Sequence, residues 1–200
     1  MEVGFHTFPN GKQYAYVMRE GRKIFLRNAL FLRNAAHKDQ IAVVRTWGAK
    51  SDRGAWEPPK GQVEWSEFAA AHIQAGSRIS YKSLVAVLRS GALRELREEA
   101  KLLPSELHGL TLLPTIYMQS NAALRGSYFM YVFWTATVTN AALQQAARRM
   151  AVFSNNRFIT SVLPHDVWEK DAIKWWSPTA DGWEHIRGEF SEKMTRLFYS

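Results

Sequence analysis

The chain has no cysteine among its 200 residues. Without cysteine it can form no disulfide framework, no thiolate metal site and no cysteine nucleophile. It also lacks a long apolar run, because the longest apolar segment, from Tyr128 to Val138, is shorter than the about 20 residues of a membrane-spanning helix. The first residues show no basic region followed by an apolar stretch, so no signal peptide is expected. We therefore expect a cytoplasmic, intracellular protein with no membrane partner.

Internal repeats, low-complexity linkers, Walker-type glycine loops and zinc-finger spacings are absent as well. The length suits one domain with a sizeable core. We therefore expect residues 1–200 to form a single domain. Nothing in the sequence fixes the oligomeric state.

Acidic residues are the scarcer charged class, with 18 Asp and Glu against 26 Lys and Arg, which gives a net charge of +8. The basic residues crowd the N-terminal region, where Glu2 and Glu20 are the only acids before Asp39. The basic residues of this region include Lys12, Arg19, Arg22, Lys23, Arg27 and Arg33. This balance favours anionic partners such as nucleic acid or polyphosphates.

Three carboxylates at positions i, i+3 and i+4 stand out within the run from Arg94 to Leu102: Glu95, Glu98 and Glu99. On a helix this spacing places them on one face, where like charges repel unless a cation joins them. Oxygen ligands suit hard cations such as Mg²⁺ and Mn²⁺. The run therefore predicts either a metal-binding face or an ordinary solvated helix face.

A second segment, from Trp56 to Glu67, follows the apolar stretch Ile41–Val44 and contains Pro-Pro-Lys-Gly, which predicts a turn at Lys60 and Gly61. Together the two segments resemble the Nudix box, G-x5-E-x7-R-E-U-x-E-E-x-G-U, where U is aliphatic. The matching residues are Gly61, Glu67, Arg94, Glu95, Leu96, Glu98, Glu99 and Leu102. The Trp-Glu-x-Pro-Lys-Gly approach is similar to that of dinucleoside polyphosphate hydrolases and of decapping-type Nudix enzymes of large DNA viruses.

The chain departs from the box twice. Between Glu67 and Arg94 lie 26 residues where the box has seven, so the resemblance requires an insertion at about 68–90. The box glycine is replaced by Lys101. Because that glycine normally ends the helix in a left-handed cap, we expect the helix to continue to Leu102 or Leu103.

The resemblance implies a Nudix pyrophosphohydrolase, an enzyme acting on acid anhydrides. Its metal ligands would be Glu95, Glu98 and Glu99, assisted by the backbone carbonyl of Gly61, with Mg²⁺ or Mn²⁺ as cofactor. The implied catalytic set is Glu98, Glu99, Glu67 and Arg94, and Glu67 and Arg94 would form a buried ion pair that holds the loop to the helix. If the viral resemblance holds, the location would be the host cytoplasm.

Substrate contacts are less defined. Lys60 is a candidate for a substrate phosphate, and Trp47 is one of four tryptophans, with Trp65, Trp175 and Trp176, that are candidates to stack on a base or cap. Glu169 and Asp171 are downstream candidates for the general base, and Glu169 also for substrate binding. Each has an ordinary structural alternative as a surface or core residue.

The predicted substrate is capped RNA or a related nucleotide polyphosphate. The alternatives are a dinucleoside polyphosphate or diphosphoinositol polyphosphate hydrolase and, in another class, a non-catalytic Nudix-fold module that binds RNA or protein.

Propensity and periodicity indicate an α/β (α+β) protein, and the resemblance implies a Nudix-like α/β/α sandwich with a mixed central sheet. The expected strands are 13–19, 23–27, 41–47, 110–118 broken by Pro114, 125–138 and 173–176. The expected helices are 68–74, 84–103 with Ser83 as N-cap and an interruption at Ser90-Gly91, 141–152 and 189–198.

Overall fold

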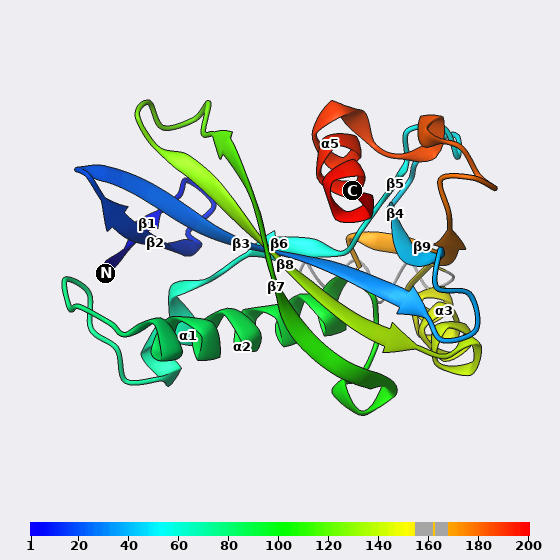
Figure 1. Cartoon of the computed structure of the whole chain (residues 1–200), viewed down its shortest axis with the longest axis horizontal. Helices are drawn as coiled ribbons and strands as arrows, with labels where there is room; N and C mark the ends of the chain where they lie inside the picture. The colour runs from blue at the N-terminus through cyan, green and yellow to red at the C-terminus, as the bar shows by residue number, and fades with distance from the viewer. Residues whose placement is uncertain (155–161, 163–167) are drawn as a thin grey trace. The chain divides into compact units, whose positions relative to one another are not determined.

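The computed structural model describes residues 1–154, 162 and 168–200. Nine strands belong to one sheet accompanied by α-helices, so the predicted α/β (α+β) class is confirmed (Figure 1). The chain divides into two compact units, which are described separately below. Unit 1 comprises Met1–Ala29, Lys60–Arg94 and Leu113–Phe133, and unit 2 comprises Leu30–Pro59, Glu95–Leu112 and Trp134–Ser200.

In unit 1 the strands β1 (Glu2–Thr7), β2 (Gln13–Arg19) and the first part of β3 (Arg22–Asn34) form an antiparallel meander. The short strand β6 (Lys60–Gln62) pairs with β3, so that Gly61 lies opposite Asn28. Lys60 and Gly61 are therefore strand residues, and the predicted turn at these positions is wrong. Unit 1 also contains parts of β7 (Leu107–Ser120) and β8 (Tyr128–Val138).

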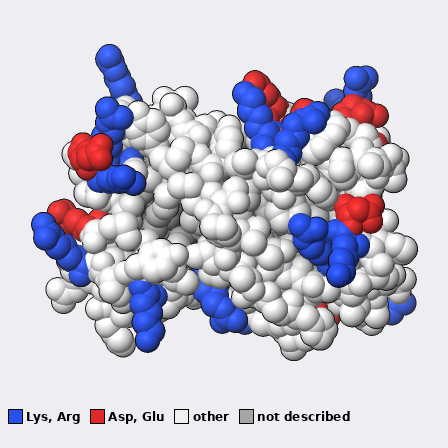
Figure 2. All heavy atoms as spheres, viewed as in Figure 1, with Lys and Arg blue, Asp and Glu red and all other residues white. Residues whose placement is uncertain are grey.

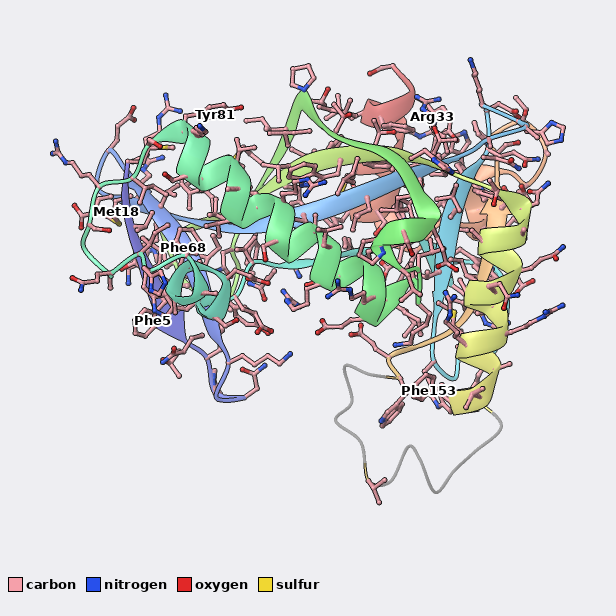
Figure 3. All side chains as sticks on the ribbon, turned by 90° about the horizontal axis from the view of Figure 1, so that it is seen from below. Phe5, Met18, Arg33, Phe68, Tyr81 and Phe153 are labelled. Carbon is pink, nitrogen blue, oxygen red and sulfur yellow. The ribbon has the colours of Figure 1, made fainter. Side chains whose placement is uncertain are left out.

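One face of the unit 1 sheet is covered by helix α1 (Trp65–Ala70) and the first part of helix α2 (Tyr81–Glu99). Figure 3 shows both helices in front of the strands, with Phe5 and Phe68 on this side. The ring of Phe5 lies 5.1 Å from that of Trp65, which stacks on Phe68. Alternate strand residues such as Val17 fill the core on this face, as period-2 patterning requires.

In unit 2, strand β4 (Ile41–Thr46) pairs antiparallel with β9 (Lys170–Trp176) and with the short strand β5 (Trp56–Glu57). A bridge between Trp56 and Ile186 is parallel. Helices α3 (Asn140–Ser154) and α5 (Gly188–Tyr199) lie on opposite sides of β4 and β9 (Figures 1 and 3). The 3₁₀ turns η1 (Pro104–Glu106) and η3 (Trp183–His185) complete the described elements of this unit.

Several predicted boundaries are wrong. Helix α2 begins at Tyr81, because the Ser80 hydroxyl rather than Ser83 accepts the N–H of its first turn, and it continues through Ser90 and Gly91. Strand β7 continues through Pro114. The first helix covers Trp65–Ala70 instead of 68–74, because Glu64 and Glu67 form a capping box at its start.

The predicted continuation of α2 to Leu102 or Leu103 is also wrong. The helix ends at Glu99, and Lys101 adopts a left-handed conformation with φ of 53°. The Leu102 N–H then bonds to the Leu96 carbonyl at 3.3 Å. Lys101 thus takes the conformation that glycine takes in a helix cap.

Basic side chains are spread over the face of the molecule shown in Figure 2. No helix among the described residues is long and apolar enough to cross a membrane.

Candidate functional site

The predicted ion pair between Arg94 and Glu67 is present in unit 1. Arg94 Nε donates to Glu67 Oε1 at 2.6 Å, and Arg94 Nη2 donates to the Gln62 carbonyl at 2.7 Å. Glu67 is 8% exposed, and its second oxygen accepts the Glu64 N–H at 2.6 Å. Burial raises the pKa of Glu67 above its ordinary value, against the opposing effect of Arg94. Arg94 therefore ties strand β6 and the start of α1 to helix α2.

Gly91 makes this arrangement possible. A Cβ atom added at Gly91 would lie 2.9 Å from Asn28 Nδ2 and 3.4 Å from Glu67 Oε1. The side chains of Asn28 on β3 and Glu67 on α1 thus approach the backbone of α2 so closely that a side chain at position 91 would force Asn28 to shift. This explains a glycine inside a helix, where it costs about 1 kcal/mol relative to alanine.

The three predicted metal ligands occupy the last turns of α2. Glu95 and Glu99 are each 6% exposed, and Glu98 is half-buried, so a solvated helix face is wrong for two of the three. Buried carboxylates require partners. Their donor chemistry suits a hard divalent cation. Among the described residues, however, no three acidic or histidine side chains are grouped so that they hold a metal ion.

A lysine supplies the cation at Glu99. Lys170, at the start of β9, is 1% exposed, and its ammonium lies 2.8 Å from Glu57, 3.1 Å from Glu99 and 3.4 Å from Glu169. Burial alone would lower the pKa of Lys170, but the attraction of Glu99, Glu57 and Glu169 raises it above its ordinary value. Lys170 therefore stays charged and neutralises carboxylates on three segments of unit 2.

Glu57 extends this cluster toward the surface. It is 3% exposed, and besides Lys170 it contacts Arg187 Nη1 at 3.4 Å and accepts a hydrogen bond from Ser191 at 3.2 Å. Sequence reasoning assigned no role to Glu57, Lys170 or Arg187. Glu57 belongs to the Trp-Glu-x-Pro-Lys-Gly segment, which was the one available signal. The other two are far away in sequence and carry no motif.

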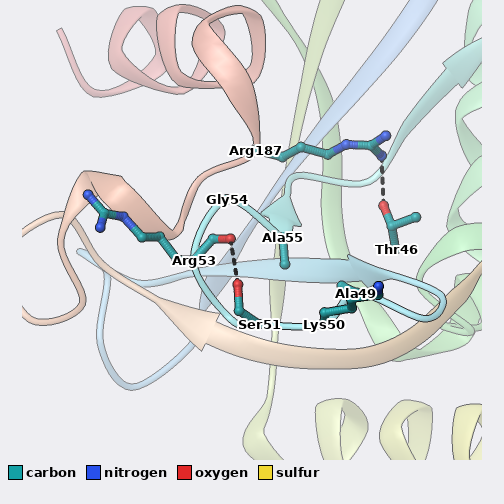
Figure 4. Close-up of a pocket in the computed structure, with 8 residues that line it drawn as sticks. All are labelled: Thr46, Ala49, Lys50, Ser51, Arg53, Gly54, Ala55 and Arg187. Carbon is teal, nitrogen blue, oxygen red and sulfur yellow. Dashed lines mark hydrogen bonds between the residues drawn. The ribbon is translucent and has the colours of Figure 1, made fainter.

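Arg187 also lines a basic pocket of about 300 Å³ in unit 2 (Figure 4). The lining residues are Thr46, Ala49, Lys50, Ser51, Arg53, Gly54, Ala55 and Arg187, which include three cations, two hydroxyls and no acid. Arg187 Nη1 donates to Thr46 Oγ1 at 2.7 Å. The lining suits an anion, and Arg187 connects the pocket to Glu57.

The remaining predicted residues lie in different surroundings. The Trp47 ring packs edge-on against Trp168 at 5.5 Å, and the backbone N–H of Trp47 donates to the Glu169 carbonyl, so Trp47 and Glu169 are neighbours in unit 2. Asp171 is engaged by Arg45 at 2.8 Å. Lys60 and Gly61 belong to unit 1, as do Glu67 and Arg94. The structure thus brings the predicted residues together in two groups, one in each unit.

Comparison with known proteins gave no matching family model and no matching curated protein. Among solved structures, the chain is similar to a C. elegans Ap4A hydrolase binary complex, with 17% identity, a TM-score of 0.46, and coverage of 88% of this chain and 95% of that one. It is similar to the NUDIX domain of Shewanella oneidensis NrtR complexed with ADP ribose, with 15% identity, a TM-score of 0.49, and coverage of 87% and 85%. A NUDIX hydrolase from Nitrosomonas europaea matches with 12% identity, a TM-score of 0.46, and coverage of 88% and 89%.

Proposed function

We propose that this chain is a Nudix-type pyrophosphohydrolase that cleaves a phosphoanhydride bond in capped RNA or a related nucleotide polyphosphate. The observation that carries the proposal is the contact of Arg94 with both Glu67 and the Gln62 carbonyl. The two halves of the motif, separated by 26 residues, are thereby joined as the resemblance to the Nudix box implies. The three carboxylates lie within the next five residues of the same helix.

The proposed cofactor is Mg²⁺ or Mn²⁺, which would be held by Glu95, Glu98 and Glu99 of helix α2. A bound divalent cation would neutralise phosphate charge and lower the pKa of a water molecule. The chain itself supplies buried acids on one helix and a cationic pocket, lined by Lys50, Arg53 and Arg187, that is suited to a phosphate chain. Glu98 is half-buried, and the ammonium of Lys170 contacts the neighbouring Glu99 at 3.1 Å.

The decisive experiment measures hydrolysis of capped RNA, dinucleoside polyphosphates and diphosphoinositol polyphosphates with Mn²⁺ or Mg²⁺. Glu98→Gln should lower turnover of the preferred substrate about a hundredfold or more, because it removes a half-buried ligand charge. Glu189→Gln, on the exposed start of α5, removes the same charge outside the site and should leave turnover unchanged. Full activity of Glu98→Gln would rule out this centre.

A non-catalytic binding module is the second candidate, and the engagement of Glu99 by Lys170 favours it. A thermal-shift titration with Mn²⁺ separates the two. An enzyme of the proposed kind should gain stability as the cation binds, and Glu98→Gln should weaken that gain. A module that uses no cation should show no dependence on the ion.

A further inference from the structure

The face of the unit 1 sheet that points away from α1 and α2 is aromatic. It presents alternate residues of neighbouring strands: His6 of β1, Tyr14 and Tyr16 of β2, Phe25 of β3, and Phe129 and Tyr131 of β8. We call this set the aromatic face. Ring contacts connect it, with Tyr16 at 5.7 Å and Phe129 at 6.0 Å from the central Phe25. Phe8 joins from the turn after β1, at 5.7 Å from Phe25.

The rings are arranged as a platform with exposed parts. Phe25 and Tyr131 are buried beneath their neighbours, whereas His6, Tyr14, Tyr16 and Phe129 are half-buried. Tyr16 lies across β1, where a Cβ atom on Gly4 would come within 2.7 Å of its ring. Gly4 therefore leaves room for the Tyr16 ring to lie against the backbone of β1.

Two cations stand among the rings. Lys23 Nζ lies 4.9 Å from the centre of the Tyr16 ring, and the Arg27 guanidinium lies 4.9 Å from Phe129 and 5.0 Å from Tyr131. Arg27 also donates to the Tyr131 hydroxyl at 2.5 Å. Within the described part of the chain, neither cation contacts a carboxylate, and the buried Arg27 Nε has no hydrogen-bond partner.

The charge of the molecule is concentrated in this unit. Unit 1 contains eleven lysines and arginines against four acids, a net charge of +7, whereas the rest of the chain carries +1. Three of the four acids are already paired, and the fourth, Glu2, lies at the edge of the aromatic face in the cross-strand row of Lys23. Glu67 is bound by Arg94, Glu64 is 3.5 Å from Lys12, Glu20 is 3.7 Å from Arg19, and Glu2 lies opposite Met18.

We propose that the aromatic face of unit 1 binds single-stranded RNA, with bases stacked on its exposed rings and phosphates attracted by Lys23 and Arg27. Aromatic rings on an open sheet face, interleaved with cations, are how proteins hold unpaired bases without reading a duplex. In a duplex the faces of the bases are stacked on one another, so a duplex would interact with this surface through its phosphate charges alone. The choice of RNA over DNA rests on the proposed function, in which capped RNA is the substrate. Binding of a single strand to the aromatic face does not itself require that the protein hydrolyses anything.

The test uses the full chain and a labelled oligouridine of about twelve nucleotides with a 5′-hydroxyl end, a length that one such surface accommodates. This probe contains no phosphoanhydride, so its binding can fail or succeed independently of the proposed function. Fluorescence anisotropy should show binding that weakens steeply with salt. It should also show preference for the single strand over the same length of duplex RNA and over inorganic polyphosphate at equal charge.

Lys23→Gln combined with Arg27→Gln should weaken binding and make the slope of log affinity against log salt shallower by about 1.4, the value for two lost phosphate contacts. The matched control is Lys82→Gln with Arg89→Gln, two exposed cations of α2 in the same unit. It removes equal charge but should change affinity less than the first pair. A larger effect of the control pair would place the RNA on α2 and overturn the proposal.

Stacking is tested by Phe129→Leu, which keeps an apolar side chain but removes the ring. It should lower oligouridine affinity about tenfold with an unchanged salt slope. A thermal melt verifies that the variant remains folded, and Tyr128→Leu, on the neighbouring position of β8 that faces the other way, serves as its control. Equal affinity for polyphosphate and oligouridine, or no effect of Phe129→Leu, would reduce the surface to general electrostatic attraction and contradict base stacking.

Discussion

Lys170 shows how one residue decides the state of the candidate site. Its ammonium is fully buried and contacts Glu57 and Glu99 within 3.1 Å. Lys170→Met should lower the free energy of unfolding by about 3–5 kcal/mol, because it removes the buried ammonium that neutralises Glu57 and Glu99. Urea denaturation followed by tryptophan fluorescence measures the loss.

The same variant tests whether the carboxylates accept a metal ion. If Mn²⁺ can replace the lost ammonium, saturating Mn²⁺ should stabilise Lys170→Met more than it stabilises the unaltered protein. Lys174→Met, at a half-buried lysine four positions further along β9, is the control and should show no such gain. Equal stabilisation of all three proteins would mean that Lys170 and the cation do not share ligands.

Lys101 marks a limit of residue-level prediction. Because non-glycine residues avoid positive φ, a lysine at this position predicted that the helix would not end in a left-handed cap and would continue further. The structure accommodates the left-handed conformation by giving the side chain partners: Nζ donates to the Glu98 carbonyl at 2.6 Å and lies 5.1 Å from the Phe153 ring. Those partners come from tertiary packing, which no local pattern reveals.

At the scale of the element, Gly91 tests the packing of α2. Alanine at an interior helix position normally stabilises by up to about 1 kcal/mol. Here Gly91→Ala should destabilise by about 1–3 kcal/mol, because its Cβ would meet Asn28 at 2.9 Å. Thermal or urea unfolding measures the change. Ser90→Ala, on the exposed neighbour, should stabilise slightly, and a stabilising Gly91→Ala would refute the close approach.

Elements with a strong local pattern were predicted from sequence. The apolar run of β4, the aromatic strand β8 and the helices α3 and α5 lie where propensity placed them, within a few residues. The prediction failed for elements whose structure depends on pairing with neighbouring strands. Pro114 was expected to break β7, but among the described strands β7 pairs with β8 alone, and an edge strand tolerates a residue without an N–H. Strand β1 was missed because its pairing with β2 stabilises a segment with a weak pattern of its own.

The candidate site was likewise predicted from the sequence only in part. The ion pair of Arg94 and Glu67 followed from spacing and resemblance alone, across 26 intervening residues. The basic pocket and the Glu57–Lys170–Arg187 contacts did not, because they join segments more than 100 residues apart. Pairing over such distances is set by the sheet register and leaves no short motif in the sequence.

At the scale of the whole molecule, the net charge was readable from the sequence but its location was not. Unit 1 collects three separate chain segments, and only their assembly concentrates a charge of +7 there. Charge gathered on one unit attracts and orients polyanions more effectively than the same charge spread evenly. The uneven distribution therefore supports an RNA partner better than the total of +8 does.

The division into two units makes cooperativity of unfolding a test of the predicted single domain. Strand β3, strand β8 and helix α2 each contribute residues to both units, so neither unit can unfold completely without breaking elements of the other.

Hydrogen exchange in a urea series should therefore show peptides from β2 in unit 1 and β4 in unit 2 losing protection at the same urea concentration, as one cooperative domain requires. The tryptophan fluorescence signal should give the same midpoint, although only Trp65 of the eight tryptophans lies in unit 1. If β2 lost its protection at a clearly lower concentration than β4, the units would be separate domains, and the effects of Lys170→Met on unit 2 and Gly91→Ala on unit 1 would have to be measured on separate transitions.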